Sequence, residues 1–438
     1  MAHIIYMDLE NFIPVTTIQG IPVDVYVSQN PNKRFIIWGA GHAGTLLARS
    51  FQRYGLLGKI FAFSDSLIRK SSNLTLGLSI ISVEEALILC KGTDTILILT
   101  VPGQNGKLGK TCEDAGLTQG VDFIKHSVLR RQEIAIETVK PDPYLSFESA
   151  TLGITPDSVE AMSYSTYVNV FEKLFAEIPN IYQIDFSCSP DPLFNIDLPK
   201  IIEHTERFAP TSVTTELSGA LNFDEILSSH PTQFVVSINY WESAFIKRFD
   251  AYRWSTFRDR FMDFCEIQHK FAEYTHIRVK FNRFSNNQTP SDLESIKVIC
   301  NQYGIKLVFA DGYMNKYDDL LLRYSGTQKK SIDKHEIDKL SWDLDTAMKL
   351  SAMDKSLPCL CQRIFPVINH DSSLAVCHLY KLPKLHPSFL SISLNELIDI
   401  RHSSNQCRTC QSHALHRLDI SILQQRHPDQ LVASNHTP

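Results

Sequence analysis

The stretch IYQIDFSCSPDPLFNIDLPKIIEH, residues 181–204, decides the fold of the larger part of this chain. It begins as a short run of mixed apolar and polar residues, passes through a turn that contains prolines, and continues with apolar residues at helical spacing. The same order of strand and helix recurs between residues 144 and 311. Repeated strand–helix units predict an α/β protein with a parallel sheet and right-handed crossovers.

Six strands are predicted in this region, after a connector at 130–143 that contains two prolines. The strands mix apolar and polar residues, which favours a (βα)6 partial TIM barrel with a polar interior over a flat doubly wound sheet. In such folds the functional residues lie at the carboxyl ends of the strands. The predicted strands are 144–149, 181–187, 212–217, 233–239, 276–282 and 305–311, and the polar residues at their ends are Glu148, Cys188, Asp191, Glu216, Asn239, Lys280, Asn282 and Asp311.

A separate unit precedes this region. RFIIWGAGHAGTLLARSF, residues 34–51, predicts a strand, a glycine turn and a helix, and Gly39, Gly41 and Gly44 form G-x-G-x-x-G within it. Asp65 ends the next predicted strand, where an acid that reaches a ribose hydroxyl would lie. The pattern predicts a Rossmann-like parallel sheet that holds a dinucleotide such as NAD(P), although the same turn can serve packing alone.

The overall composition excludes some partners. Hydrophobic residues make up 43% of the chain and charged residues 21%, as in an ordinary folded protein, and the formal net charge is −5. Neither nucleic acid nor a membrane is therefore expected as a partner. The start, MAHIIYMDLENF, lacks a basic segment, so no secretory signal is predicted and a cytoplasmic location is expected.

Half of the ten cysteines lie between residues 359 and 410. In a reducing compartment such a set favours metal binding or catalysis over disulfides. A predicted hairpin with its turn at HDSS separates Cys359 from Cys377, and Cys407 and Cys410 form CxxC. Four thiolates suit a [4Fe–4S] cluster or a tetrahedral zinc, with Cys361 as an alternative ligand to Cys359.

These segments resemble known families. Residues 1–130 resemble the small Rossmann-like modules attached to bacterial sugar-modifying enzymes. IYQIDFSCSPDPLFNIDLPKIIEH, HIRVKFNRFSNNQTPSDLESIKVICNQYGIKLVFADG, CLCQRIFPVINHDSSLAVC and SISLNELIDIRHSSNQCRTC resemble successive parts of a radical SAM enzyme with a SPASM or twitch extension. The resemblance implies a [4Fe–4S] cluster at the C-terminal cysteines. Together the segments predict domains at 1–130, 140–330 and 331–420, and the polar end of the sequence predicts a flexible tail at 425–438.

The sequence departs from that family at the centre where the chemistry takes place. The family's CxxxCxxC motif is absent, since 147–162 read FESATLGITPDSVEAM and no cysteine lies between Cys112 and Cys188. The family's G-G-E turn reads Ser189-Pro190-Asp191, in which proline removes an N–H group. Ordinary reductive cleavage of S-adenosylmethionine is therefore not expected. Cys188, Asp191 and Glu148 remain as weak catalytic candidates, and whether the chain is an enzyme stays open.

Three functions follow from these patterns. The first is a degenerate radical-SAM-like iron–sulfur protein that acts as a binding partner or electron relay in a modification pathway. The second is an NAD(P)-dependent oxidoreductase or sugar-modifying enzyme that uses the Rossmann-like module. The third is a structural protein stapled by zinc. The expected partner is a protein, or a small molecule such as a sugar.

Overall fold

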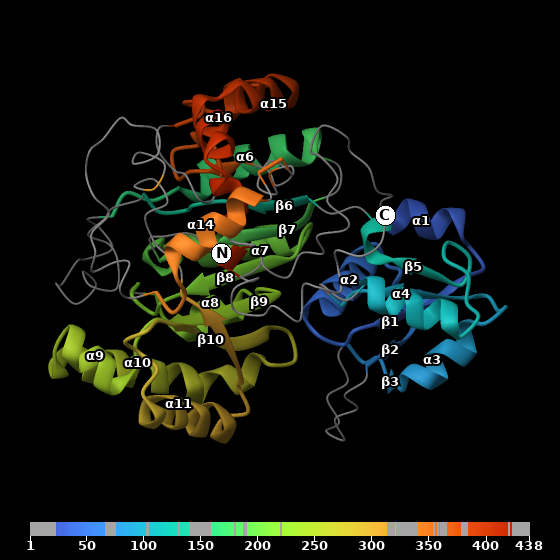
Figure 1. The fold of residues 1–438 in the computed structure, drawn as a ribbon, viewed down its shortest axis with the longest axis horizontal. Helices are drawn as coiled ribbons and strands as arrows, with labels where there is room; N and C mark the ends of the chain where they lie inside the picture. Colours follow the sequence, from blue (N-terminus) through green and yellow to red (C-terminus); the bar gives the residue numbers. More distant parts are fainter. Residues whose placement is uncertain are drawn as a thin grey trace.

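A computed structural model of the chain contains two parallel sheets, each with its own helices (Figure 1). The α/β class predicted from the strand–helix order is confirmed. The structure describes residues 23–65, 76–101, 105–129, 132–140, 159–178, 181–186, 191–219, 221–312, 320, 340–353, 355–356, 359, 366–377, 384–418 and 421–422.

The first sheet has five strands in the order β3-β2-β1-β4-β5. This is the order of doubly wound nucleotide-binding sheets. Helices cover both faces of this sheet. Successive residues of β1 point to opposite faces, so Phe35 and Ile37 pack in one apolar core, and Ile36 and Trp38 pack in another. The elements are α1 (Val23–Gln29), β1 (Arg34–Trp38), α2 (His42–Arg53), β2 (Ile60–Ser64), β3 (Ile80–Ile81), α3 (Val83–Cys90), β4 (Thr95–Leu99), α4 (Asn105–Asp114) and β5 (Phe123–Lys125).

The second sheet has six parallel strands in the order β11-β10-β9-β8-β7-β6. Each strand lies beside the one that precedes it in sequence, as in a (βα) barrel. The elements are β6 (Gln132–Ala135), α6 (Tyr164–Glu177), β7 (Ile181–Phe186), α7 (Leu198–Glu206), β8 (Thr211–Thr215), α8 (Phe223–Ser228), β9 (Gln233–Ile238), α9 (Glu242–Arg248), α10 (Ala251–Ile267), β10 (His276–Arg283), α11 (Pro290–Gln302) and β11 (Lys306–Asp311).

The first strand of this sheet corrects the sequence analysis. β6 lies within the predicted connector 130–143 and pairs with β7 from Gln132 to Ala135. The second sheet therefore begins before residue 140. The prolines at 141 and 143 suggested a linker, but they follow β6 and so do not interrupt its hydrogen bonds. The strand predicted at 144–149 lies outside the described residues.

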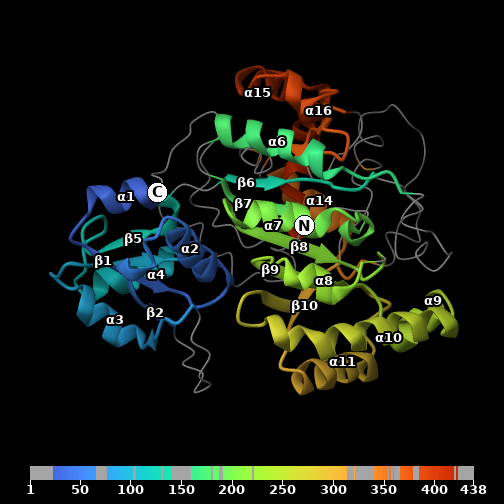
Figure 2. The same cartoon turned by 180° about the vertical axis from the view of Figure 1, so that it is seen from behind.

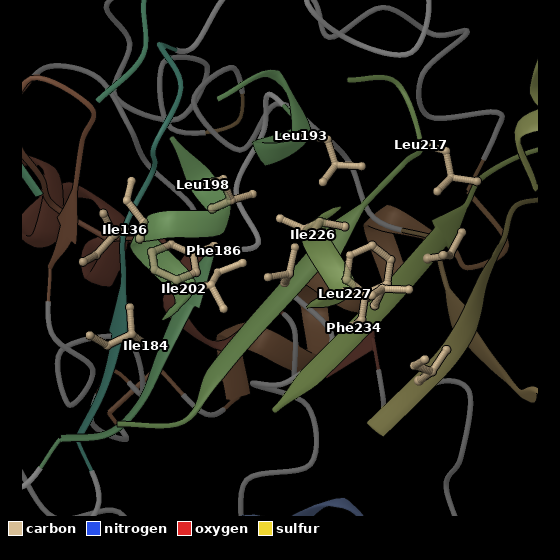
Figure 3. Packing of buried hydrophobic residues seen from close by; sticks show 14 of the residues in the cluster. Ile136, Ile184, Phe186, Leu193, Leu198, Ile202, Leu217, Ile226, Leu227 and Phe234 are labelled. Carbon is tan, nitrogen blue, oxygen red and sulfur yellow. The ribbon is translucent and has the colours of Figure 1, made fainter. Parts of the chain in front are cut away.

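Helices pack against one face of the second sheet. Figure 3 shows Ile184, Phe186 and Phe234 of the strands against Ile202 of α7 and Leu227 of α8, all within one buried core. The alternate strand residues point to the other face, as the period of two requires. On β7, β9 and β10 many of these residues are polar, in agreement with the predicted polar interior.

The C-terminal segment attaches to the edge and to the carboxyl ends of this sheet. The predicted hairpin is confirmed as antiparallel β12 (Val367–Ile368) and β13 (Leu374–Ala375), and Ile368 bridges to Ile136 beyond β6. The indole N–H of Trp342 donates to the carbonyl of Gly312, just after β11. Figures 1 and 2 show α14 on the face opposite α7 and α8. The remaining helices are α14 (Leu344–Met353), α15 (Leu394–Ser403) and α16 (Asn405–Ser412).

The two modules touch at the amino ends of β8, β9 and β10. Arg49 of α2 donates to the carbonyl of Tyr274, 2.9 Å away, just before β10 begins. Arg49 also interacts with Glu206, whose carboxylate accepts the backbone N–H groups of Thr211 and Thr232. The carboxyl ends point away from the first module (Figure 2). No helix among the described residues is long and apolar enough to cross a membrane.

Candidate functional site

Four cysteines predicted to bind metal approach one another in the C-terminal segment, and we call Cys359, Cys377, Cys407 and Cys410 the thiol cluster. Three of them, all but Cys407, are buried in one packed core, and Cys407 is half-buried beside it. They come from three segments that are separate in sequence, at 359, 377 and 407–410. The rest of this C-terminal apolar core consists of Leu320, Leu340, Trp342, Leu344, Ala347, Leu415, Leu418 and Ile422.

Local structure presents the CxxC cysteines together. The motif lies on α16, where a spacing of three places Cys407 and Cys410 on the same face. Ser404 begins this helix by accepting the backbone N–H of Cys407, 3.2 Å away. On the other side of the cluster, the β12–β13 hairpin turns through Ser372, whose φ of +63° is left-handed, and leads to Cys377.

The pKa of Cys407 depends on two other thiols of the cluster and on two neighbouring side chains. The pKa of Cys407 is raised first by burial and then by its neighbours Cys377 and Cys359, while a hydrogen bond with Ser404 and the charge of Arg401 lower it. Arg401 is only 3% exposed, so a cationic side chain is buried beside the sulfur atoms. Sequence analysis missed Arg401, because only the packing of α15 against α16 brings it there.

Thiolates are metal ligands, and the thiol cluster supplies four residues of this type. Bringing several thiolates together costs electrostatic free energy, which a bound cation offsets while it lowers the pKa of each thiol. None of the described cysteines is joined to another by a disulfide. No group of three or more His, Cys, Asp or Glu side chains among the described residues is placed so that it could hold a metal ion. The sulfur atoms instead pack among leucine, tryptophan and alanine side chains.

The glycine turn of the first module has the predicted shape. Gly39 has a φ of +116°, which favours glycine, and a Cβ at Gly44 would lie 1.8 Å from the carbonyl oxygen of Gly39. A Cβ at Gly41 would meet no atom within 4 Å. The first and third glycines therefore serve the turn and close packing, whereas Gly41 leaves open space at the start of α2. Asp65 lies beside the turn and accepts the backbone N–H of Ala40.

Asp191 is buried and takes part in a dense set of hydrogen bonds. Its Oδ2 accepts from the hydroxyl of Thr215, the backbone N–H of Glu216, and both the N–H and the hydroxyl of Ser218, at 2.7–3.0 Å. Its Oδ1 accepts from the backbone N–H of Leu193. The carboxylate thus ties the loop after β7 to the loop after β8, and this geometry favours a positioning role over a catalytic one.

An amide network crosses the carboxyl ends of β8, β9 and β10. Asn239 donates to Glu216 at 2.9 Å, and Asn282 donates to Asn239 at 2.7 Å and to Ser237 at 2.9 Å. The side-chain amide of Asn287 donates to the carbonyl oxygens of Asn239 and Asn282. The predicted strand-end residues are therefore brought together on adjacent strands. Asn287, which anchors them, was missed because it lies in a loop without a recognisable pattern.

The remaining residues predicted from the sequence do not define a site. Asp311 accepts from Arg283 at 3.1 Å, a pair between neighbouring strands β11 and β10. Lys280 lies on the polar face of β10, and burial followed by the charge of Arg278 lowers its pKa to about 8. Glu148, Cys188 and Cys361 lie outside the described residues, as does the tail 425–438.

Comparisons with known proteins yield structural likenesses alone. The sequence matches no protein-family model and no curated protein. A structure described as native anSMEcpe with bound AdoMet is similar over 69% of this chain and 100% of that chain, at 14% identity and a TM-score of 0.39. Streptococcus suis SuiB bound to precursor peptide SuiA is similar over 84% of this chain and 80% of that chain, at 10% identity and a TM-score of 0.41. BtrN in complex with AdoMet and 2-DOIA is similar over 66% of this chain and 90% of that chain, at 12% identity and a TM-score of 0.32. The strand order and register, and not these likenesses, define the fold.

Proposed function

We propose that this chain is a radical-SAM-like iron–sulfur protein that carries one [4Fe–4S] cluster on its thiol cluster and does not itself cleave S-adenosylmethionine. The observation that supports this proposal is that cysteines from three separate segments of the chain meet in or beside one buried core near Arg401. When bound, the iron–sulfur cluster would supply one-electron transfer. The protein would then act as a binding partner or electron relay in a modification pathway.

The chain's own residues support this role. Buried thiols next to a buried arginine favour a centre with net negative charge, as four thiolates around a [4Fe–4S] cluster or a zinc ion would be. Hydrogen bonds from Trp342 and Ser341 to carbonyl oxygens of Gly312 and Arg283 fix the neighbouring core to the carboxyl ends of the sheet. The centre would therefore lie on the side of the molecule where the second sheet presents its polar residues.

Metal analysis of protein purified without oxygen tests the proposal. We expect about four iron and four sulfide per chain and a brown colour. One zinc per chain in colourless protein would instead establish the zinc-stapled alternative. About eight iron per chain, or 5′-deoxyadenosine formed from S-adenosylmethionine on reduction, would overturn the absence of a catalytic cluster.

Matched cysteine variants assign the ligands. Cys407→Ala should abolish iron binding, whereas Cys300→Ala should retain it, because Cys300 lies on α11 in the apolar core of the second sheet. Cys359→Ala and Cys361→Ala, made separately, show which of the two is the ligand. Equal iron content in the Cys407 and Cys300 variants would exclude the thiol cluster as the binding site.

Dinucleotide binding by the first module is the second candidate, favoured by the open space at Gly41. Titration with NADH, followed by fluorescence, should detect binding that Gly41→Val abolishes. No binding by the unmodified chain would remove this candidate. An oxidoreductase would also need the nicotinamide to reach the polar carboxyl ends of the second sheet, whereas Arg49 contacts its amino ends. We therefore favour a role in binding for this module.

A further inference from the structure

α16 carries two of the four thiols but is held weakly by the rest of the protein. All eight residues of this helix are described, and Cys410 alone is buried. The helix sequence, NQCRTCQS, contains no large apolar side chain that could pack in a core. Most of the stability of a helix in a protein comes from the burial of an apolar face. α16 is therefore an element that can move at a low cost in free energy.

The segments around α16 are firmly anchored. Before it, α15 places Leu397 in the large core of the second sheet, at 1% exposure. After it, η10 (Leu415–Arg417) is buried, and Leu415 and Leu418 lie in the C-terminal apolar core. The hairpin that leads to Cys377 is equally fixed, because the strand residues of β12 and β13 are 0% exposed. A polar helix between fixed segments can turn about its ends without disturbing the cores beside it.

Residues with the geometry of hinges lie at both ends of α16. Ser404 has extended backbone angles, φ −62° and ψ 138°, and separates α15 from α16. Ala414 has a left-handed φ of +59°, which is unfavourable for a residue with a Cβ. Buried Ser351 of α14 holds this conformation by donating its hydroxyl to the carbonyl of Ala414. Backbone strain that surrounding contacts maintain is typical of segments that switch between two arrangements.

The thiols are neighbours without forming a metal site. Cys377 and Cys359 both raise the pKa of Cys407, and Cys410 packs with Cys359 and Cys377 in the C-terminal apolar core. Even so, no three His, Cys, Asp or Glu side chains in the described part of the chain are placed so that they could hold a metal ion. A displacement of α16 changes the positions of two thiols at once, whereas the other two lie on separate segments.

We propose that α16 is a closing helix, which turns about Ser404 and Ala414 on metal binding and so brings Cys407 and Cys410 into one ligand set with the other two thiols. The free energy of the metal–thiolate bonds offsets the cost of this rearrangement, because the full set of bonds exists only in the closed state. This inference rests on the proposed metal-binding function and adds how the site is completed.

Hydrogen exchange of the full chain, read by mass spectrometry, tests the movement. In metal-free protein we expect the amides of α16 to exchange about tenfold or more faster than those of α15, which begins with the same kind of serine cap. After anaerobic reconstitution with iron and sulfide, or after addition of zinc, exchange in α16 should slow by about tenfold or more, with little change in α15. Iron, sulfide and zinc are measured on the same samples.

The outcomes separate this inference from the proposed function. Bound metal with unchanged exchange in α16 would overturn the closing helix and leave metal binding intact. Protein that retains neither iron and sulfide nor zinc would overturn both. Exchange in α16 as slow as in α15 before metal is added would overturn the closing helix by itself, because α16 would then be as firmly held as its neighbour.

Matched serine variants test the hinge. Ser351→Ala removes the hydroxyl that holds Ala414 and should speed exchange in α16 severalfold in metal-free protein. Ser421→Ala is the control, because this equally buried hydroxyl donates to the carbonyl of Arg417 instead. The difference between the two variants should disappear after loading, because metal ligation then holds α16. Equal exchange in the two metal-free variants, or a difference that persists after loading, would exclude Ala414 as the hinge.

Discussion

At the residue scale, the glycines of the G-x-G-x-x-G turn in the first module have different physical roles. Gly44 allows α2 to approach the turn, because its missing Cβ would overlap the carbonyl oxygen of Gly39. Gly41 has ordinary backbone angles and open space around its Cα. The same motif therefore contains one glycine required by packing and one that leaves room for a ligand.

Gly44→Ala should lower the free energy of unfolding by about 3 kcal/mol, because backbone must move to relieve the overlap. Gly41→Ala is the matched control and should cost no more than about 1 kcal/mol, the difference between glycine and alanine at a helix N-cap. Urea unfolding followed by the fluorescence of buried Trp38 on β1 measures both. Equal losses would show that the close approach at Gly44 is not required.

His276 should make stability depend on pH in the acid range. Burial, followed by the charges of Arg278 and Lys306, lowers its pKa to about 4. The unfolded chain takes up a proton as the pH falls below about 6.5, whereas the folded chain resists it down to about 4. Stability should therefore decrease from pH 6.5 to 4 by at most roughly 3 kcal/mol. His276→Gln should flatten this part of the curve, and parallel curves for the two proteins would contradict the expectation.

At the element scale, the caps of two successive helices allow stability and thiol chemistry to be separated. Ser393 caps α15 in a complete capping box with Glu396, and Ser404 caps α16. Both caps satisfy backbone N–H groups at a helix start. The side chain of Ser404 alone also forms a hydrogen bond with Cys407 that lowers the pKa of its thiol.

Ser404→Ala and Ser393→Ala should each lower stability by about 1 kcal/mol. Ser404→Ala should in addition raise the pKa of Cys407 and slow its alkylation, because the thiolate loses a hydrogen bond. Rates of iodoacetamide labelling of metal-free protein at several pH values, read by mass spectrometry for Cys407, distinguish the variants. A Ser393 variant with an equal change in labelling would show that fraying of the helices, and not the hydrogen bond, controls the thiol.

At the scale of the whole molecule, Arg49 links the two modules. Burial lowers the pKa of its guanidinium, Glu206 raises it, and the side chain donates to the carbonyl of Tyr274. Glu206 also satisfies the N–H groups that begin β8 and β9. A contact of this kind couples the first module to the amino ends of the second sheet.

Arg49→Met should weaken this coupling by about 1–3 kcal/mol, because the variant leaves a charge and a carbonyl without their partner. Hydrogen exchange should then show faster opening of the first sheet, with little change in β8 and β9. Arg207→Ala is the control, since Arg207 forms only an exposed pair with Glu203 and should change stability by less than about 1 kcal/mol. Unchanged exchange in the Arg49 variant would show that the modules are coupled elsewhere.

The sequence by itself determined the strand–helix order, the glycine turn and the hairpin before Cys377. Each depends on residues within one or two turns of one another, where periodicity, glycine and proline act directly. Sequence reasoning failed at β6, because the prolines after it were the strongest local signal and its partner β7 lies beyond a long connection.

Tertiary structure alone decided which of the polar residues act together. The hydrogen bonds of Asp191 come from the loop after the next strand, and the coupling of Cys407 to Cys377 and Cys359 joins separate elements. Such contacts depend on distances in space between residues far apart in the chain, and no local pattern of amino acids encodes those distances.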